Sequence, residues 1–178
     1  MKSIYDIVQY PNTSLFVPCQ SLTKFSKAES MEDYLHEAVL RNGGLAVAAN
    51  QLGLNIRSFF MKVAEKNLFA INPHVLDFSI ETTVMNEGCL SIPSVLWHVR
   101  RPCEILLEYY DKEGNRHEQE FSGLEARVIL HEIDHLDGIL IPSYLDDQLF
   151  DVFIEAYTSN LNKKNTYIEI DDEVVVRY

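Results

Sequence analysis

Hydrophobic residues recur with helical spacing in a segment past the middle of the chain, between Ser122 and Gly138. Its apolar positions are Ala126, Ile129, Leu130, Ile133 and Leu136. This spacing predicts a helix with one buried face. Ser122, with Glu125 three residues later, matches a capping box, and Gly138 is a typical C-terminal stop. We therefore expect a buried helix over residues 122–135.

A second helix is predicted from Ser26 to about Arg41. Ser26 and Glu29 again have capping-box spacing, and Asn42-Gly43-Gly44 is expected to end the helix. Its inward-facing residues would be Ala28, Met31, Leu35, Ala38 and Val39. His36 does not belong to this stripe, so we expect its side chain to be exposed to solvent.

Segments rich in β-branched and aromatic residues predict strands elsewhere. The expected strands cover residues 4–8, 57–63, 68–71, 74–84 (one or two strands), 103–110 and 116–121. Asn72-Pro73 is expected to end a strand, because proline cannot donate to a sheet. Residues 86–93 are predicted to form a loop with Cys89 at its centre.

The C-terminal part predicts an amphipathic helix over about residues 143–161 and a final hairpin. The hairpin would pair residues 167–170 with residues 174–178 across Asp171-Asp172-Glu173. These elements predict an α+β fold in which antiparallel or mixed sheets pack around the central buried helix. The sequence contains no internal repeat or linker, so residues 1–178 are expected to form a single domain.

Composition limits the classes of partner. The chain has 178 residues and a formal net charge of −12, which argues against direct nucleic-acid binding. No apolar run approaches the length of a membrane span, and the first residues lack the apolar core of a signal peptide. Three cysteines without a C-x-x-C pair predict free thiols in a reducing compartment.

The central helix carries a candidate metal site. His131 and His135 are four residues apart, so both imidazoles lie on one helical face and can bind the same ion. Glu132 lies about 100° round the helix and can reach a metal-bound water. Two histidines at this spacing also occur as ordinary core residues, but a glutamate directly after the first one favours the metal site.

A catalytic metal site needs a third protein ligand. A third histidine six residues after His135 is excluded, because Ile141 occupies that position. Glu155 in the following helix is one candidate, although its face of that helix looks solvated. Cys89, between a glycine and a leucine in the predicted loop, is the stronger one because an accessible thiolate binds borderline-soft ions well. Its alternative role is that of a buried structural cysteine, which we also expect for Cys19 and Cys103.

Residues 44–53 form a small, apolar and nearly uncharged stretch that contains the amide pair Asn50-Gln51. One interpretation is a tightly buried segment in which backbone packs on backbone. The other is a backbone that a ligand approaches closely, with Gln51 as an oriented hydrogen-bond donor. The sequence leaves both open.

Three stretches together resemble the peptide deformylases: Gly44 to Gln51, Glu87 to Ser91, and His131 to His135. The second stretch is Glu-Gly-Cys-Leu-Ser and the third is His-Glu-x-x-His, with Asp134 also matching. They occur in the family's order, with Cys89 placed 42 residues before His131. The resemblance extends over roughly residues 1–150 and implies a catalytic domain.

The resemblance implies that Cys89, His131 and His135 bind one divalent metal, Fe²⁺ in most members, with Zn²⁺, Ni²⁺ or Co²⁺ also accepted. It implies Glu132 as general base and acid, with Gln51 and the Leu90 N–H binding the oxyanion. The metal-bound water would attack the formyl group on the N-terminal methionine of a nascent polypeptide. The expected substrate-binding residues are Gly44, Leu45, Ala46, Glu87, Leu124, Arg127 and Val128.

The sequence departs from the family pattern in three places. Ala46 replaces a glycine, and Arg127 stands where the family presents an apolar residue to the methionine pocket. We expect Arg127 either to contact Glu87 or to extend its charged head outwards, leaving a methionine-sized pocket. The rival is that Arg127 recognises an acidic substrate residue. The C-terminal helix carries Asp146, Asp147, Asp151 and Glu155, so docking to the ribosome through a basic helix is left open.

Two other functions remain open at this stage. A metallopeptidase would use Glu155 as third ligand, and a non-catalytic metal-binding or interaction domain would need a fourth ligand to close the site. The expected location is the cytoplasm, or an organelle stroma or matrix if a transit peptide has been removed. We expect no membrane partner.

Overall fold

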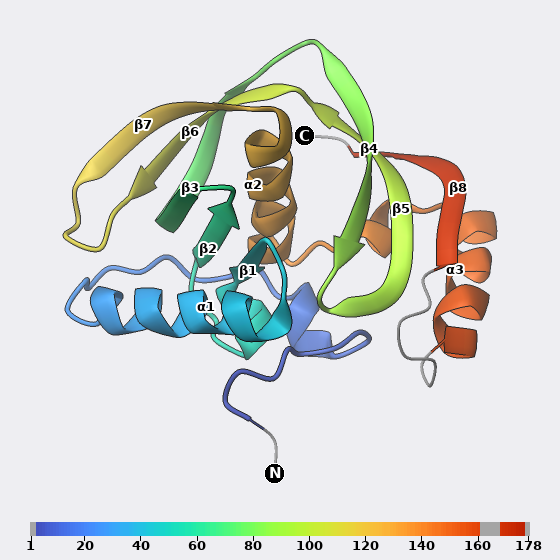
Figure 1. Ribbon diagram of the computed structural model, residues 1–178, viewed down its shortest axis with the longest axis horizontal. Coiled ribbons are helices and arrows are strands. Elements are labelled where there is room, and N and C mark those ends of the chain that lie inside the picture. Colours follow the sequence, from blue (N-terminus) through green and yellow to red (C-terminus); the bar gives the residue numbers. More distant parts are fainter. Residues whose placement is uncertain (1–2, 161–167, 177–178) are drawn as a thin grey trace.

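The central helix α2 (Gly123–Leu136) lies between two β-sheets in the computed structural model (Figure 1). The structure describes residues 3–160 and 168–176. The predicted stripe of apolar residues on α2 is buried, and it packs against residues of the larger sheet such as Phe59, Leu107 and Phe121. The predicted α+β class, with sheets packed around a buried helix, is confirmed.

The larger sheet has five antiparallel strands in the order β1-β2-β3-β6-β7. These are β1 (Ala46–Ala48), β2 (Ser58–Val63), β3 (Lys66–Phe78), β6 (Glu104–Tyr110) and β7 (Arg116–Ser122). Both predicted hairpins are present, as β2–β3 and β6–β7. The second hairpin leads directly into α2, because β7 ends at Ser122 and the helix begins at Gly123.

The smaller sheet contains β4 (Thr82–Cys89), β5 (Ile92–Pro102) and β8 (Ile168–Val175), in the order β4-β5-β8. β4 and β5 form an antiparallel hairpin, whereas β8 runs parallel to β5, so this sheet is mixed. β4 and β5 lie beside α2 (Figure 1), and the end of β4 reaches the helical face with the two histidines, because Cys89 Sγ lies 3.2 Å from His135 Nε2.

The two remaining long helices cover one sheet each. α1 (Ala28–Asn42) packs against β1 and β2, and its five predicted inward-facing residues are buried. α3 (Asp147–Asn160) packs against β5 and β8, with the Phe153 ring 5.9 Å from the Trp97 ring. Short 3₁₀ segments cover Thr13–Phe16, Ala49–Leu52 and Ile141–Tyr144. No helix in the described part of the chain is long and apolar enough to cross a membrane.

Both predicted capping boxes are wrong. Ser122 is the N-cap of α2 but makes no side-chain capping bond, and Glu125 instead forms an ion pair of 2.7 Å with Lys66 at the β2–β3 turn. α1 begins at Ala28 with Lys27 as its N-cap, so Ser26 lies outside the helix. In α2, Glu125 pairs with a lysine from another element, so it does not form the capping bond that the local pattern predicted.

Three strand predictions are also corrected. Residues 4–8 form no strand, and Asn72-Pro73 does not end one. β3 continues through this dipeptide as a bulge, in which Asn72 has a φ of 50° and its side-chain amide exchanges two hydrogen bonds with the Leu22 backbone. The expected loop over residues 86–93 is largely strand, because β4 extends to Cys89 and β5 begins at Ile92.

The C-terminal prediction is corrected as well. Residues 168–175 form one continuous strand, β8, where a hairpin was expected; residues 167 and 177–178 of that hairpin lie outside the described residues. α3 begins at Asp147, later than the predicted start near residue 143, because Pro142 belongs to a separate 3₁₀ segment. His36 is half-buried, stacked on Phe60 with ring centres 4.7 Å apart, where full exposure was expected.

Gly138, just after α2, and Gly53, just after the 3₁₀ segment Ala49–Leu52, both have left-handed backbone. Comparing alanine variants of the two tests how closely the chain approaches Gly138. A Cβ on Gly138 (φ 73°) would lie 2.8 Å from the Phe16 carbonyl carbon, whereas a Cβ on Gly53 (φ 79°) meets nothing within 4 Å. Gly53→Ala should cost about 1 kcal/mol of unfolding free energy from backbone strain alone. Gly138→Ala should cost clearly more in urea denaturation, because backbone atoms must also move. Equal losses of unfolding free energy in the two variants would contradict the close approach of the Phe16 backbone to Gly138.

Candidate metal centre and active site

α2 and the end of β4 bring together three side chains that can hold a metal ion. One ligand atom each from Cys89, His131 and His135 lies within 4.8 Å of the others. The Cys89 Sγ is 3.2 Å from His135 Nε2, and the two imidazole rings have centres 5.0 Å apart. A thiolate and two imidazoles suit a divalent transition metal, so the donor set fits the predicted ion.

The β4–β5 turn determines where Cys89 lies. β4 reaches the helix at Cys89, Leu90 and Ser91 form the turn, and Cys89 is then paired with Ile92. The Cys89 side chain is consequently buried, whereas the sequence suggested an accessible loop position. Cys103 precedes β6 and does not belong to the ligand group found among the described residues.

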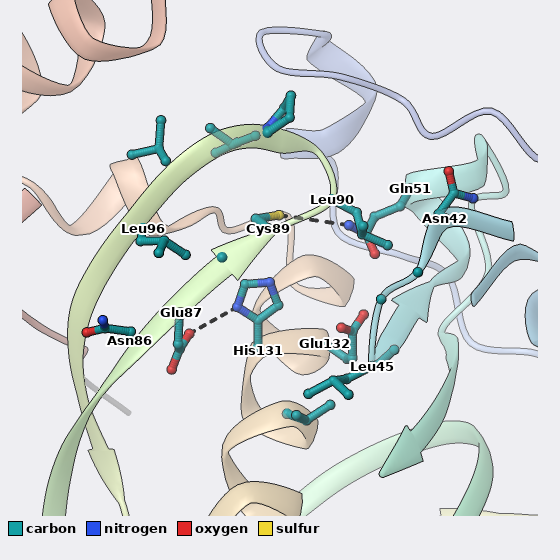
Figure 2. A pocket seen from close by; sticks show the side chains of 18 of the residues that line it. Asn42, Leu45, Gln51, Asn86, Glu87, Cys89, Leu90, Leu96, His131 and Glu132 are labelled. Carbon is teal, nitrogen blue, oxygen red and sulfur yellow. Dashed lines mark hydrogen bonds and ion pairs between the residues drawn. The ribbon is translucent and has the colours of Figure 1, made fainter. Parts of the chain in front are cut away.

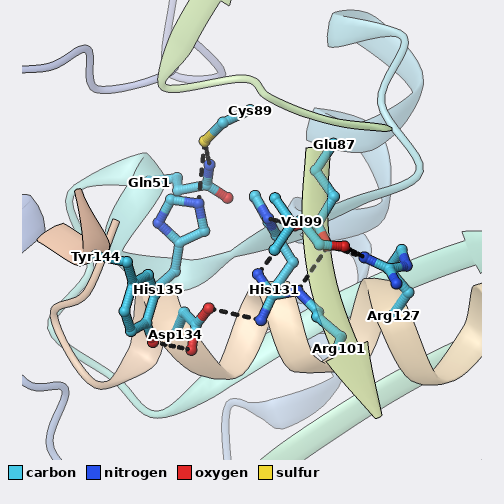
Figure 3. A network of polar contacts seen from close by, with 10 residues as sticks. All are labelled: Gln51, Glu87, Cys89, Val99, Arg101, Arg127, His131, Asp134, His135 and Tyr144. Carbon is cyan, nitrogen blue, oxygen red and sulfur yellow. Dashed lines mark hydrogen bonds and ion pairs between the residues drawn. The ribbon is translucent and has the colours of Figure 1, made fainter. Parts of the chain in front are cut away.

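His131 is oriented by a carboxylate on its far side. Its Nδ1 lies 3.1 Å from Glu87 Oε2 (Figure 3), so we assign the proton to Nδ1, which then donates to the carboxylate. This tautomer leaves Nε2 as the lone-pair nitrogen for an ion. A carboxylate behind a metal-binding histidine is a common second contact, which fixes the ring and raises its basicity.

Glu87 is also bonded to two buried arginines. Arg101 on β5 reaches it through two bonds, Nε–Oε1 at 2.6 Å and Nη2–Oε2 at 2.9 Å, and also contacts Asp134 Oδ2 at 2.8 Å. Arg127 on α2 donates from Nη1 to Glu87 Oε1 at 2.7 Å. Two cations and two carboxylates are thus buried in one network (Figure 3).

The predicted contact between Arg127 and Glu87 is confirmed. The Arg127 guanidinium also donates to the Val99 carbonyl at 2.8 Å and to the Thr83 carbonyl at 2.7 Å, and so links α2 to both β4 and β5. Its head is held in the wall of the cavity and buried against the sheet.

Sequence reasoning missed Arg101, although a signal was available. Val95, Trp97 and Val99 alternate with more exposed residues, and the same alternation places Arg101 on the buried side of β5. No strand was assigned to this stretch from the sequence, so the arginine that ends the alternating series was overlooked.

The C-terminal region supports the strand that carries Arg101. α3 places Phe153 against Trp97 of β5, and β8 adds a parallel strand on which Glu173 pairs with Arg100. Arg100 points away from the core, whereas its neighbour Arg101 is buried in the network around Glu87. Adjacent residues of β5 therefore connect this network to the C-terminal strand.

The buried charges shift several protonation equilibria. Burial opposes the charge on Glu87, but hydrogen bonds from His131 and Arg101 hold its pKa well below the usual range. Burial lowers the pKa of His135 and favours the neutral imidazole that a metal requires. Burial raises the pKa of Glu132 to about 7. A carboxyl group with this pKa can both accept and return a proton at neutral pH.

A cavity of about 740 Å³ opens beside these residues (Figure 2). It is lined by all seven predicted substrate-binding residues, Gly44, Leu45, Ala46, Glu87, Leu124, Arg127 and Val128, and by Gln51, Leu90, Cys89, His131 and Glu132. Glu132 is buried, and its Oε2 has no hydrogen-bond partner among the described residues. An unpaired buried carboxylate oxygen beside a cavity is suited to bind a water or a substrate N–H.

Gln51 is buried and held by its own segment. Its Oε1 accepts a hydrogen bond from the Ala48 N–H at 2.9 Å, while Nε2 donates to Ser91 Oγ at 3.1 Å and lies 3.9 Å from Cys89 Sγ. The side-chain amide therefore directs its donor group toward the cysteine end of the site. Gln51 is therefore tightly packed, and its amide is held in one orientation.

The glutamate alternative for the third ligand is wrong in this structure. Glu155 is exposed on α3 and does not belong to the ligand group. Ile141 is buried in the core around Trp97 and Phe153. Within the described residues, the group contains three candidate ligands, the number that leaves one position open in a four-coordinate site.

Comparison with known proteins identifies relatives over most of the chain. The family model described as polypeptide deformylase matches residues 4–149. A peptide deformylase of Borreliella burgdorferi is 33% identical over 158 residues, which cover 85% of this chain and 94% of that protein. The crystal structure of peptide deformylase from Thermus thermophilus superposes with a TM-score of 0.81 at 32% identity, covering 88% of this chain and 95% of the other. Peptide deformylase from Ehrlichia chaffeensis in complex with actinonin gives a TM-score of 0.83 at 30% identity, with 92% and 100% covered.

The network around Glu87 predicts a measurable effect on metal affinity. Glu87→Gln replaces one carboxylate oxygen with an amide donor that faces other donors, so it should raise the Kd for Zn²⁺ about 10- to 100-fold. It should also destabilise the fold by about 3 kcal/mol, because Arg127 loses the carboxylate that it pairs with and Arg101 retains Asp134 but loses Glu87. Chelator competition and urea denaturation measure the two effects. The exposed Glu104→Gln is the control, and an unchanged Kd in Glu87→Gln would contradict this role.

Proposed function

The chain belongs to the polypeptide deformylase family, and from that premise we propose that it hydrolyses the formyl group from the N-terminal formyl-methionine of nascent polypeptides. The proposal rests mainly on one observation: Cys89, His131 and His135 lie close together beside a cavity that Glu132 also lines. We propose these three residues as the metal ligands. A divalent ion bound there would lower the pKa of its water and polarise the formyl oxygen.

Glu132 is proposed to move the proton in this reaction. Its Oε2 is unpaired among the described residues, and its pKa near 7 lets it accept a proton from the attacking water. The same carboxyl group then returns the proton to the amine that leaves with the peptide. The products are formate and a free N-terminal methionine.

Gln51 Nε2 and the Leu90 N–H are proposed to bind the negative charge that develops on the formyl oxygen. Both residues line the cavity beside Cys89 (Figure 2), and Gln51 is held by bonds at both ends of its amide. Donors that are fixed before the reaction stabilise a developing oxyanion without reorganisation.

The backbone of residues 44–46 is proposed to pair with the substrate as an added strand. β1 (Ala46–Ala48) is an edge strand of the five-stranded sheet, so one side of it has no strand partner within the described part of the chain. Gly44 approaches Leu90 closely, since a Cβ there would lie 2.8 Å from Leu90 Cδ1. Leu124 and Val128 would contact the methionine side chain together with the stem of Arg127.

We propose Fe²⁺ as the resident ion, with Zn²⁺, Ni²⁺ or Co²⁺ as functional substitutes, and the cytoplasm or an organelle stroma or matrix as the location. Ribosome contact is retained as a proposal, but α3 offers no basic face for it. Asp147, Asp151 and Glu155 on α3, and Asp146 just before it, are exposed and would repel phosphate.

A steady-state assay tests this function. The protein should release formate from formyl-methionyl dipeptides in preference to formylated peptides that begin with another residue, and should not cleave an internal peptide bond. Metal content should be measured on the same anaerobic sample, and activity should be lost on chelation and return with Fe²⁺. Cleavage of internal bonds without formate release would contradict the proposal.

The ligand assignment predicts different effects for two cysteines. Cys89→Ala should lose metal and activity together, because one of three ligands is removed. Cys103→Ala should retain both, since this cysteine lies outside the ligand group. Metal analysis of the two purified variants decides the assignment, and stoichiometric metal in Cys89→Ala would refute it.

The role of Glu132 predicts loss of turnover without loss of metal. Glu132→Gln keeps the shape of the side chain but cannot accept a proton, so kcat should fall by roughly 10² to 10⁴-fold. Metal content and thermal stability should stay near those of the unmodified protein. A decrease of less than tenfold would assign Glu132 a structural role.

The position of Arg127 predicts that substrate preference does not depend on its charge. Nη1 donates to Glu87 and the Val99 carbonyl and Nη2 donates to the Thr83 carbonyl, so the charge is already paired with a carboxylate, although Nε has no hydrogen-bond partner among the described residues. Arg127→Ile should leave the preference for formyl-methionine over formyl-glutamate intact or increase it, as measured by kcat/KM. If the native protein cleaved formyl-glutamate faster than formyl-methionine and Arg127→Ile abolished this difference, Arg127 would instead recognise an acidic substrate residue.

A further inference from the structure

The N-terminal segment Val8–Tyr10, which we call the strap, has no part in the proposed chemistry, yet it is bonded to the turn that carries Leu90. Gln9 Nε2 donates to the Leu90 carbonyl at 3.0 Å. The Tyr10 N–H donates to the Ser91 carbonyl at 2.9 Å. The turn between β4 and β5 is therefore held from outside the sheet by two consecutive residues of the strap.

The strap is also bonded to Gln51, the other proposed oxyanion donor. The Val8 N–H donates to the backbone carbonyl of Gln51 at 2.7 Å. The side chain of Gln51 is in turn bonded to Ser91 Oγ at 3.1 Å, so the two donor residues and the strap form one connected set. Gln51 and Leu90 are 39 residues apart in sequence and belong to connections of different sheets, and the strap is bonded to both.

The strap is fixed at its other side by α3. The Tyr157 hydroxyl donates to the Tyr10 carbonyl at 2.9 Å. The Tyr10 ring makes edge contacts with Tyr157 and Phe153, with ring centres 5.5 and 5.4 Å apart. Both aromatic residues lie beyond residue 149, where the match to the family model ends. A part of the chain outside that match thus supports the strap.

We propose that Gln9 is a positioning residue for the oxyanion site, and that Tyr157 supports it through Tyr10. The Leu90 carbonyl and the Leu90 N–H flank one Cα, so a bond that fixes the carbonyl also limits rotation of the N–H. This donor is needed most when charge develops on the formyl oxygen. Loss of the bond from Gln9 should therefore affect the transition state more than the bound substrate.

Gln9 is suited to a direct test because its side chain is exposed and lies outside every helix and strand. Gln9→Met keeps the length of the side chain and removes the donor. This inference rests on the proposed function, so formate release from a formyl-methionyl peptide by the unmodified protein is measured first. If the unmodified protein releases no formate, the function fails independently of this inference.

Gln9→Met should lower kcat about three- to tenfold while KM changes less than twofold and the metal content stays stoichiometric. Gln9→Lys should restore kcat, because its ammonium group can donate to the same carbonyl. Gln148→Met, an exposed glutamine on α3 away from the strap, is the matched control and should leave kcat unchanged.

Tyr157→Phe removes the hydroxyl bond to Tyr10 and keeps the ring contacts. Like Gln9→Met, it should lower kcat and leave KM unchanged. The double variant Gln9→Met/Tyr157→Phe should lose less than the product of the two single effects, since both act through the strap. An unchanged kcat in Gln9→Met would overturn the proposal. So would a decrease in kcat that is accompanied by loss of metal, or one that Gln9→Lys does not restore.

Discussion

The buried carboxylate of Glu87 is the group on which the rest of the site depends. It accepts hydrogen bonds from Arg101 on β5, Arg127 on α2 and His131 on α2, and thus joins three elements at one point. Buried charges are tolerated when they are paired and fully hydrogen-bonded, and Asp134 supplies the second negative charge that Arg101 contacts. The orientation of His131, a candidate metal ligand, is consequently fixed by its contact with this paired carboxylate.

This pairing explains how an apolar helix can carry a polar site. α2 buries one face against the five-stranded sheet, which gives it a fixed position. Its other face meets β4 and β5, where Arg127 bridges the Thr83 and Val99 carbonyls and where Cys89 reaches His135. Hydrophobic packing thus determines where α2 lies, and the ionic network determines how the smaller sheet is placed against it. The cavity lies where these two surfaces meet (Figure 2).

The sequence by itself determined the features that depend on local spacing. The period of α2, the i, i+4 histidines, the alternation of the β6–β7 hairpin and the motif around Cys89 are all set by residues close in the chain. These patterns were sufficient to predict the buried helix and to bring Cys89, His131 and His135 together as candidate metal ligands, and the contact between Arg127 and Glu87 was one of two predicted outcomes. The contact followed because a buried guanidinium requires an anion, and Glu87 is the acidic residue two positions from Cys89.

The tertiary structure decided the pairings between distant residues. Glu125 binds Lys66 in place of a helix cap, Asn72 accommodates a bulge where proline suggested a strand end, and residues 168–175 pair in parallel with β5 as one strand. The same holds for Arg101, which contacts Glu87 and Asp134, 14 and 33 residues away along the chain. Such partners cannot be identified from propensity or periodicity, because they depend on which elements the hydrophobic core brings together.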